Sequence, residues 1–203
     1  FAGYHRQSYG GCKVGVGDVL IGATATAAEY SGVGQASHIK RKIAEMVHLN
    51  ETLFSCGLAC SYMGAPTSSG TYLVDLLLAN VCKQNVTRFP YEIARLAEDI
   101  AGGMMVTMPS EKDWRNPELR PYIEKYVRGV ADVPTEDRMR ILRLLENMTV
   151  GTGAVAYRTE SMHGAGSPEA QVIVIGRLSN IAHKKDLARS EEHTSELQSP
   201  YVI

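Results

Sequence analysis

The spacing of apolar residues along the chain predicts amphipathic helices rather than strands. Between residues 39 and 60, apolar and small residues recur at the three- and four-residue steps of one helix face. This pattern predicts a long helix that begins near Ser37, a suitable N-cap residue, and ends near Tyr62. Helices of this length are typical of bundles, in which long helices pack side by side.

Shorter helices are predicted on both sides of this long one. They cover residues 14–30, 72–83, 90–100, 117–130, 134–147 and 168–187. Residues 1–13 are predicted to be irregular because Gly10 and Gly11 interrupt them. No pair of strands is predicted, so the expected fold class is all-α, with the helices arranged as a bundle.

The end of the sequence does not follow the helical pattern. Residues 189–199 read RSEEHTSELQS, and they contain no apolar periodicity that a core could use. This string resembles the translation of a sequencing-library adaptor residue for residue, although an ordinary polar tail is the alternative. We therefore divide the chain into a segment 1–13, a helical domain 14–188 and a non-native tail 189–203. The chain also lacks an initiator Met, and we expect an upstream part to be missing.

Composition excludes several classes of protein. The 21 basic and 22 acidic residues are nearly balanced and form no basic patch, which argues against a nucleic-acid-binding protein. The longest apolar runs are too short and too interrupted to span a bilayer, so no membrane partner is expected. Four cysteines in 203 residues are too few for a disulfide scaffold, and a reduced, cytoplasmic protein is expected.

The first candidate site lies near the start of the chain. Residues with reactive side chains cluster within nine positions there, namely His5, Arg6, Gln7, Tyr9, Cys12 and Lys13. Imidazole and thiolate together are good ligands for zinc or for the iron of an iron-sulfur cluster. A histidine with ordinary hydrogen-bond partners and a buried free cysteine would explain the same pair without a metal.

Two further cysteines offer a possible completion of this site. Cys56 and Cys60 are four residues apart on a predicted helix, so they share one face. With His5 and Cys12 they would make four ligands. Their surroundings are apolar and rich in small residues, however, which favours packing in the core, and the same holds for Cys82.

The second candidate site lies before the last predicted helix, in the sequence RTESMHGAGSP of residues 158–168. A Gly-rich turn that leads into a helix presents free N–H groups to anionic or polar cofactor atoms, although a plain loop is the alternative. The residues expected to contact a cofactor are Gly164, Gly166 and Ser167. Glu160, beside an apolar cofactor, would have a raised pKa and act as a base or acid, or it would simply be solvated.

A third stretch, residues 102–114, contains several Met residues and Trp114. It would suit a contact with a cofactor or an acyl-CoA. We favour the other interpretation, in which Met and Trp side chains anchor a loop at a subunit interface.

The sequences FAGYHRQSYGGCKVG, from residue 1, and ESMHGAGSP, from residue 160, resemble the family of 4-hydroxybutyryl-CoA dehydratase/vinylacetyl-CoA isomerase. The resemblance extends from Phe1 to about Ala188. This family is related to the flavin-dependent 4-hydroxyphenylacetate 3-monooxygenases and has an architecture like that of acyl-CoA dehydrogenases. The chain would then be the C-terminal helical domain. The His/Cys pair is specific, because the related monooxygenases lack it.

The resemblance implies two cofactors, FAD and a four-iron four-sulfur cluster. In the family, three cysteines and one histidine hold the cluster; His5 and Cys12 match two of these ligands, and the other two would lie upstream of Phe1. Tyr9 and Lys13 match residues near the cluster and the flavin, and Glu160 matches an active-site glutamate.

The implied function is dehydration of 4-hydroxybutyryl-CoA to crotonyl-CoA, together with isomerisation of vinylacetyl-CoA. The resemblance also implies an acyl-CoA substrate, a homotetramer and missing N-terminal and middle domains, without which the chain alone would be inactive. One alternative is a two-component flavin monooxygenase that acts on a phenol and needs no iron. A second alternative is a non-catalytic helical module for oligomerisation.

Overall fold

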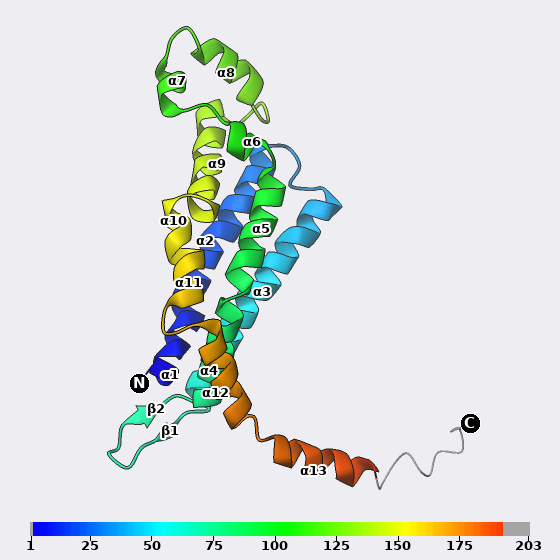
Figure 1. Cartoon of the computed structure of the whole chain (residues 1–203). Coiled ribbons are helices and arrows are strands. Elements are labelled where there is room, and N and C mark those ends of the chain that lie inside the picture. The colour runs from blue at the N-terminus through cyan, green and yellow to red at the C-terminus, as the bar shows by residue number, and fades with distance from the viewer. Residues whose placement is uncertain (1, 193–203) are drawn as a thin grey trace, which may run out of the picture.

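Four long helices form the body of the molecule in the computed structural model, which describes residues 2–192. They run side by side along its length (Figure 1) and are α2 (Tyr9–Tyr30), α3 (Ser37–Tyr62), α5 (Phe89–Ala101) and α9 (Thr135–Thr149). Helix α2 packs against the other three, and the core between them includes the fully buried Leu20, Met46, Ile93 and Leu145. The predicted all-α fold and its bundle arrangement are confirmed.

Short helices cover the two ends of this bundle (Figure 1). One end is built from α1 (Ala2–His5), the 3₁₀ turn η1 (Arg6–Ser8), α4 (Leu76–Val86), α11 (Glu160–His163) and α12 (Pro168–Leu178). The other end carries α6 (Met104–Thr107), α7 (Glu111–Arg115) and α8 (Arg120–Val127). The remaining elements are α10 (Thr152–Ala154), the π-helical turn η2 (Val155–Thr159), α13 (Ile181–Glu191) and an antiparallel pair of strands, β1 (Ala65–Pro66) and β2 (Tyr72–Leu73).

The prediction that residues 1–13 are irregular was wrong. The described part of this segment is helical, and Gly10 and Gly11 lie inside α2 rather than ending it. The reason is packing against α3, because a Cβ atom on Gly10 would lie only 2.8 Å from the Cα atom of Gly57. The close approach of two helices offsets the low helix propensity of glycine here.

Other element boundaries also differ from the predicted ones. The apolar helix predicted from Tyr72 begins at Leu76, because Asp75 caps it by accepting a hydrogen bond of 2.7 Å from the Leu78 backbone N–H. The predicted final helix is broken at Asn180, whose left-handed backbone separates α12 from α13. Residues 104–114, predicted to lack a helix, contain α6 and α7.

The predicted tail, residues 189–203, lies only in part within the residues that the structure describes. Arg189 to Glu191 form the exposed last turn of α13, and residues 193–203 lie outside the described part of the chain. The boundary at 189 therefore stays a prediction. Across residues 2–192, no helix combines the length and the apolar character needed to cross a membrane.

Candidate active site

The two predicted clusters meet at one end of the bundle, although about 150 residues separate them in the sequence. Tyr9 Oη donates a hydrogen bond of 2.7 Å to Glu160 Oε1. Lys13 Nζ donates to the other carboxylate oxygen, Oε2, and to the backbone carbonyl of Ala156 at 2.5 Å. Helix α2 thus supplies a phenol and an ammonium group that hold one carboxylate of α11 in place.

The Glu160 carboxylate has a pKa below its usual value. Partial burial of the side chain, which is 42% exposed, opposes this shift. The hydrogen bonds from Lys13 and Tyr9 outweigh burial, and the positive charges of Lys13 and Lys83 add to their effect. The sequence-based expectation of a raised pKa therefore does not hold in this fold, where Glu160 is an ionised, hydrogen-bonded carboxylate.

Tyr9 lies at the centre of the cluster and is only 5% exposed. Burial raises its pKa well above the usual value, and the hydrogen bond to Glu160 and the negative charge of that carboxylate raise it further. Tyr9 is therefore a neutral hydrogen-bond donor at any ordinary pH.

One buried cation of this site, Lys83, was missed by the sequence analysis. Lys83 of α4 is fully buried; its Nζ atom donates to the Ser161 carbonyl and lies 4.0 Å from the centroid of the Tyr9 ring. Burial lowers the pKa of Lys83 to about 8, while the negative charge of Glu160 opposes the shift. The only signal in the sequence was a lysine within an otherwise apolar helix, a position where an unpaired charge is costly.

Arg6, which the sequence analysis grouped with the first candidate site, is a further buried cation. Its Nε donates to the Ala165 carbonyl at 2.9 Å, and one terminal nitrogen donates to Asn80 Oδ1. Arg6 is 5% exposed, and burial lowers its pKa. The guanidinium group thus fastens the loop after α11 to η1 and α4.

The glycines of that loop make room for side chains of the site. A Cβ atom on Gly164 would overlap both Glu160 Oε1 and Tyr9 Oη, and one on Gly166 would lie 2.8 Å from a terminal nitrogen of Arg6. Gly166 also has a φ of +103°, which disfavours other residues. Side chains of this chain fill the spaces beside Gly164 and Gly166. Ser167 is exposed at the start of α12, and its side chain does not cap the helix. The cofactor contacts expected of Gly164, Gly166 and Ser167 stay predictions.

His5 and Cys12 lie on the exposed side of the same helical segment. Tyr9 is four residues after His5 and three before Cys12, so it lies between them along these helical turns. The His5 ring stands edge-on to that of Tyr9, with centroids 6.1 Å apart. Among residues 2–192, no group of three or more His, Cys, Asp or Glu side chains could hold a metal ion. Both side chains are exposed, and their role as metal ligands stays a prediction.

The other three cysteines pack between α3 and α4. Cys60 and Cys82 are fully buried. Burial raises the pKa of the Cys60 thiol to about 11, and the negative charge of the nearby Asp75 adds to this effect. A hydrogen bond with Cys56 raises the pKa of the Cys82 thiol. Thiols with raised pKa values are poor metal ligands. Burial and the raised pKa therefore support the core-packing interpretation of Cys60. Cys56 is half-buried, and a hydrogen bond with Cys82 lowers its pKa, so its core-packing interpretation stays a prediction.

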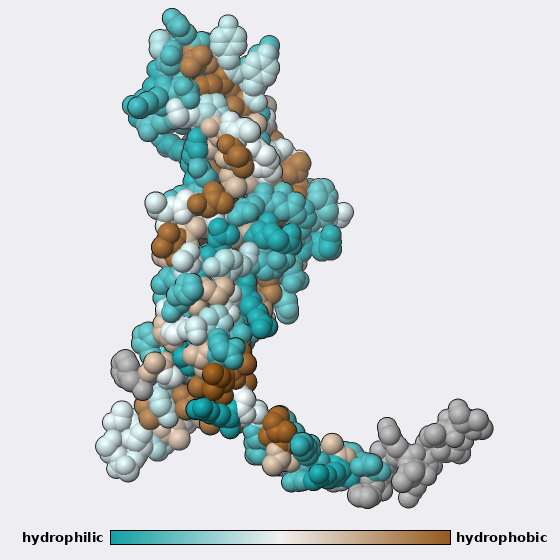
Figure 2. Space-filling view, in the orientation of Figure 1, coloured by the Kyte–Doolittle hydropathy of each residue, from teal (hydrophilic) through white to brown (hydrophobic). Residues whose placement is uncertain are grey.

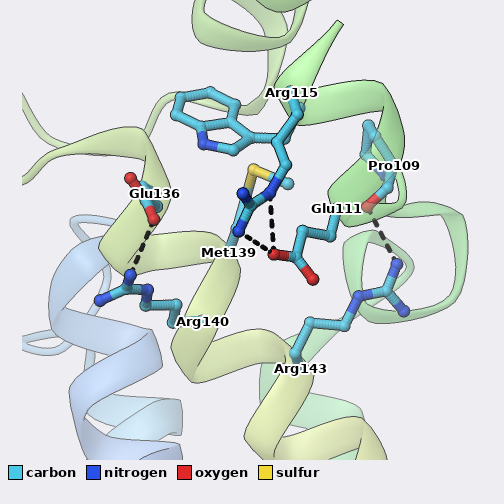
Figure 3. Close-up of a pocket in the computed structure, with 8 residues that line it drawn as sticks. Pro109, Glu111, Arg115, Glu136, Met139, Arg140 and Arg143 are labelled. Atoms are coloured by element: carbon cyan, nitrogen blue, oxygen red, sulfur yellow. Dashed lines mark hydrogen bonds and ion pairs between the residues drawn. The ribbon is translucent and has the colours of Figure 1, made fainter.

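A cavity of about 430 Å³ opens at the opposite end of the bundle, between α7 and α9 (Figure 3). Its charged walls are paired with one another: Arg115 with Glu111 at 2.5 Å and Arg140 with Glu136 at 2.8 Å. Trp114 lines this cavity and is 8% exposed. The buried indole is consistent with an anchoring role in the stretch 102–114, whereas the subunit interface expected there stays a prediction.

Apolar side chains are exposed around the junction of α12 and α13, where Figure 2 shows brown patches. Val172, Ile173 and Ile181 each keep about half of their surface exposed. Exposed apolar side chains that are grouped in this way are typical of a contact with another protein surface.

Comparison with known proteins places this site in a family. The family model described as "4-hydroxyphenylacetate 3-hydroxylase C terminal" (HpaB) matches residues 1–191. The chain belongs to this family. This chain is 62% identical, over 198 residues, to 4-hydroxybutyryl-CoA dehydratase/vinylacetyl-CoA-Delta-isomerase of Clostridium aminobutyricum. The predicted resemblance is therefore confirmed. The oxygenase component of 4-hydroxyphenylacetate 3-monooxygenase from Thermus thermophilus is 28% identical over 138 residues, or 68% of this chain and 28% of the relative.

Solved structures of the HpaB group share the fold. An oxygen-tolerant archaeal 4-hydroxybutyryl-CoA dehydratase from N. maritimus superposes with a TM-score of 0.92 at 59% identity, over 98% of this chain and 40% of that one. An HpaB oxygenase component in complex with FAD gives a TM-score of 0.82 at 22% identity, over 91% and 39%. The Clostridium alignment covers 94% of this chain, which spans 40% of that relative's length.

Proposed function

We propose that this chain supplies the Tyr9–Lys13–Glu160 site to an enzyme that dehydrates 4-hydroxybutyryl-CoA to crotonyl-CoA and isomerises vinylacetyl-CoA. The observation that carries the proposal is the cluster itself, a carboxylate held by a phenol and an ammonium group beside an exposed His5/Cys12 pair. The identities of 62% and 59% to proteins named as 4-hydroxybutyryl-CoA dehydratases support the choice of substrate.

The residues of the chain suit the proton transfers that this reaction needs. Conversion of 4-hydroxybutyryl-CoA to crotonyl-CoA removes one proton from the carbon next to the carbonyl and one from the carbon after it, expels the 4-hydroxyl group and returns one proton to C4. Glu160 is ionised and partly exposed, so it can accept a proton from a substrate carbon or return one. Lys13 and Tyr9 donate to that carboxylate, and they would also stabilise negative charge that develops on a substrate beside it. The exposed imidazole of His5 would act as a second proton carrier.

Two cofactors belong to the proposal, FAD and a four-iron four-sulfur cluster. His5 and Cys12 would hold the cluster together with two cysteines from outside the described residues, and Lys13, Gly164, Gly166 and Ser167 are the proposed flavin contacts. When bound, the flavin supplies one-electron redox chemistry, and the cluster supplies a Lewis acid for the leaving hydroxide. The chain's own part is to hold the reacting groups in place and to exchange protons with them.

The proposed partners are an acyl-CoA substrate, the further domains of the same enzyme and other copies in a homotetramer, in the cytoplasm. The exposed apolar residues Val172, Ile173 and Ile181 support a protein contact at the junction of α12 and α13.

The alternative function is that of a flavin-dependent monooxygenase, which the description of the family model and the 28% identity to the Thermus protein favour. Such an enzyme would have no use for the His5/Cys12 pair as iron ligands. Iron in the purified whole enzyme therefore separates the two functions.

The experiment that tests the proposal is Glu160→Gln in the whole enzyme, purified without oxygen. The substitution preserves shape and removes the ionisable group, so turnover of 4-hydroxybutyryl-CoA should fall by about 100- to 10,000-fold while FAD and iron are retained. Glu92→Gln is the matched control, because Glu92 pairs with Arg95 on the exposed side of α5. Equal turnover in the two variants would remove Glu160 from the mechanism.

A further inference from the structure

Three thiols lie close together where α3 packs against α4. Cys56 and Cys60 are one turn apart on α3, and Cys82 lies on α4. The Sγ atom of Cys60 is directed to the start of α4, where it lies 3.2 Å from the Asp75 carbonyl oxygen. The Sγ atom of Cys56 lies 3.8 Å from the Leu78 carbonyl oxygen, one turn before Cys82. Cys56 and Cys82 thus meet across the helix interface, and their thiols share a hydrogen bond.

The two thiols of this pair differ in exposure and in acidity. Cys56 is half-buried, whereas Cys82 has no exposed surface and also packs against α2, where a Cβ atom on Gly10 would lie 2.9 Å from its sulfur. The hydrogen bond from Cys82 lowers the pKa of the Cys56 thiol against the effect of burial, and it raises the pKa of Cys82. An accessible, more acidic thiol beside a second thiol is the arrangement of cysteines that react with oxidants.

We propose that Cys56 and Cys82 form a site of reversible oxidation, at which hydrogen peroxide converts the two thiols into a disulfide between α3 and α4. The Cys56 sulfur attacks one peroxide oxygen, the O–O bond breaks, water leaves, and Cys56 becomes a sulfenic acid. The Cys82 sulfur then attacks the Cys56 sulfur, the S–O bond breaks, and the hydroxyl group leaves as water with the proton of the Cys82 thiol. The two thiols together lose two electrons and two protons, and the peroxide is reduced to two molecules of water. A thiol reductant reverses the change by disulfide exchange.

The disulfide would join α3 to the part of α4 that supports the candidate active site. Lys83 follows Cys82 directly, and its Nζ atom donates to the Ser161 carbonyl. A disulfide stabilises a fold mainly by constraining the unfolded chain, so the cross-link would stabilise this end of the bundle. The oxidation does not depend on the reaction that the site catalyses, and its test is therefore separate from that of the proposed function.

The test maps the disulfides of the whole enzyme after treatment with hydrogen peroxide. Free thiols are alkylated without reduction, and the protein is digested with trypsin and with Asp-N protease. No Lys or Arg lies within residues 43–82, and Asp75 is the only aspartate there. Asp-N therefore separates the peptide of Cys82 from the peptide that holds Cys56 and Cys60, and only a disulfide can keep the two joined. Mass spectrometry should find the joined pair, and dithiothreitol should separate it.

Variants identify the two partners of the disulfide. Cys60→Ser is the matched control, because the sulfur of Cys60 contacts the start of α4 instead of Cys82, and this variant should keep the link. Cys56→Ser should abolish it. In Cys82→Ser the second thiol is missing, so the sulfenic acid of Cys56 should persist and react with dimedone.

Met63 serves as an internal control for the oxidant, because its side chain is 61% exposed and should become a sulfoxide in the same sample. A sample in which Met63 is oxidised while Cys82 remains a free thiol would overturn the proposal. A disulfide between Cys56 and Cys60 would overturn it as well. Both results can be read from the unsubstituted enzyme, so they do not require any variant to fold.

Discussion

Gly164→Ala should break the Tyr9–Glu160 hydrogen bond without straining the backbone. Gly164 has a φ of −59°, which alanine adopts readily, so the effect comes from the added methyl group alone. That methyl group would overlap Glu160 Oε1 and Tyr9 Oη, which are joined by a hydrogen bond of 2.7 Å. The two groups must separate to admit it.

The size of the effect follows from what the two groups lose. A hydrogen bond to a charged group contributes about 1.5–3 kcal/mol, and the lower end applies because the Glu160 side chain is 42% exposed. The buried Tyr9 hydroxyl would also be left without its acceptor, at a cost of about 1 kcal/mol or more. Replacing glycine with alanine returns about 0.4–1 kcal/mol by restricting the unfolded chain. The net loss of unfolding free energy is about 1.5–2 kcal/mol, or about 3–8 °C in Tm for a chain of this size.

Thermal unfolding followed by far-UV circular dichroism measures this loss. Gly176→Ala is the matched control, because a Cβ atom on Gly176, within α12, would meet nothing within 4 Å. The control should gain up to about 1 kcal/mol from the better helix propensity of alanine. The two substitutions should thus change stability in opposite directions. If Gly164→Ala were as stable as Gly176→Ala, the contact between Tyr9 and Glu160 would not be as described.

Three further predictions concern the tail, pH and the cysteines. Deletion of residues 189–203 should leave Tm unchanged, because this stretch lacks an apolar face, and a fall in Tm would show that it packs. Since the folded-state pKa of Glu160 is lowered, its stabilising effect is present above the unfolded pKa and is lost as pH falls through the folded one. The difference in unfolding free energy between wild type and Glu160→Gln should therefore shrink below about pH 4, and a constant difference would contradict this. In the whole enzyme, Cys12→Ala should lose iron whereas Cys56→Ala combined with Cys60→Ala should keep it; the reverse pattern in an iron assay would place the cluster inside the bundle.

The sequence predicted the helical class of the fold better than it predicted the geometry of the site. Apolar periodicity located the long helices because each buries one continuous face against its neighbours. It could not predict that residues 9–13 continue the helix through two glycines, since the compensating contact with Gly57 comes from another helix. The break at Asn180 was missed for a related reason, because a left-handed Asn carries no signal in the apolar pattern.

The contacts within the site depend on tertiary structure in the same way. His5, Tyr9, Cys12 and Lys13 could be grouped because they are neighbours in the sequence. The hydrogen bond from Tyr9 to Glu160 spans 151 positions, and only the packed bundle shows it. The expected raised pKa of Glu160 failed because Lys13 and Tyr9 supply donors that a sequence motif does not reveal.

The formation of crotonyl-CoA without oxygen tests the proposed function most directly. The whole enzyme that contains this chain should be purified anaerobically and mixed with 4-hydroxybutyryl-CoA, with no oxygen and no added reductant. Dehydration is redox-neutral overall, so crotonyl-CoA should accumulate, and Glu160→Gln should suppress it. An enzyme that forms no crotonyl-CoA, contains no iron and instead hydroxylates a phenol with oxygen and reduced flavin would contradict the proposed function.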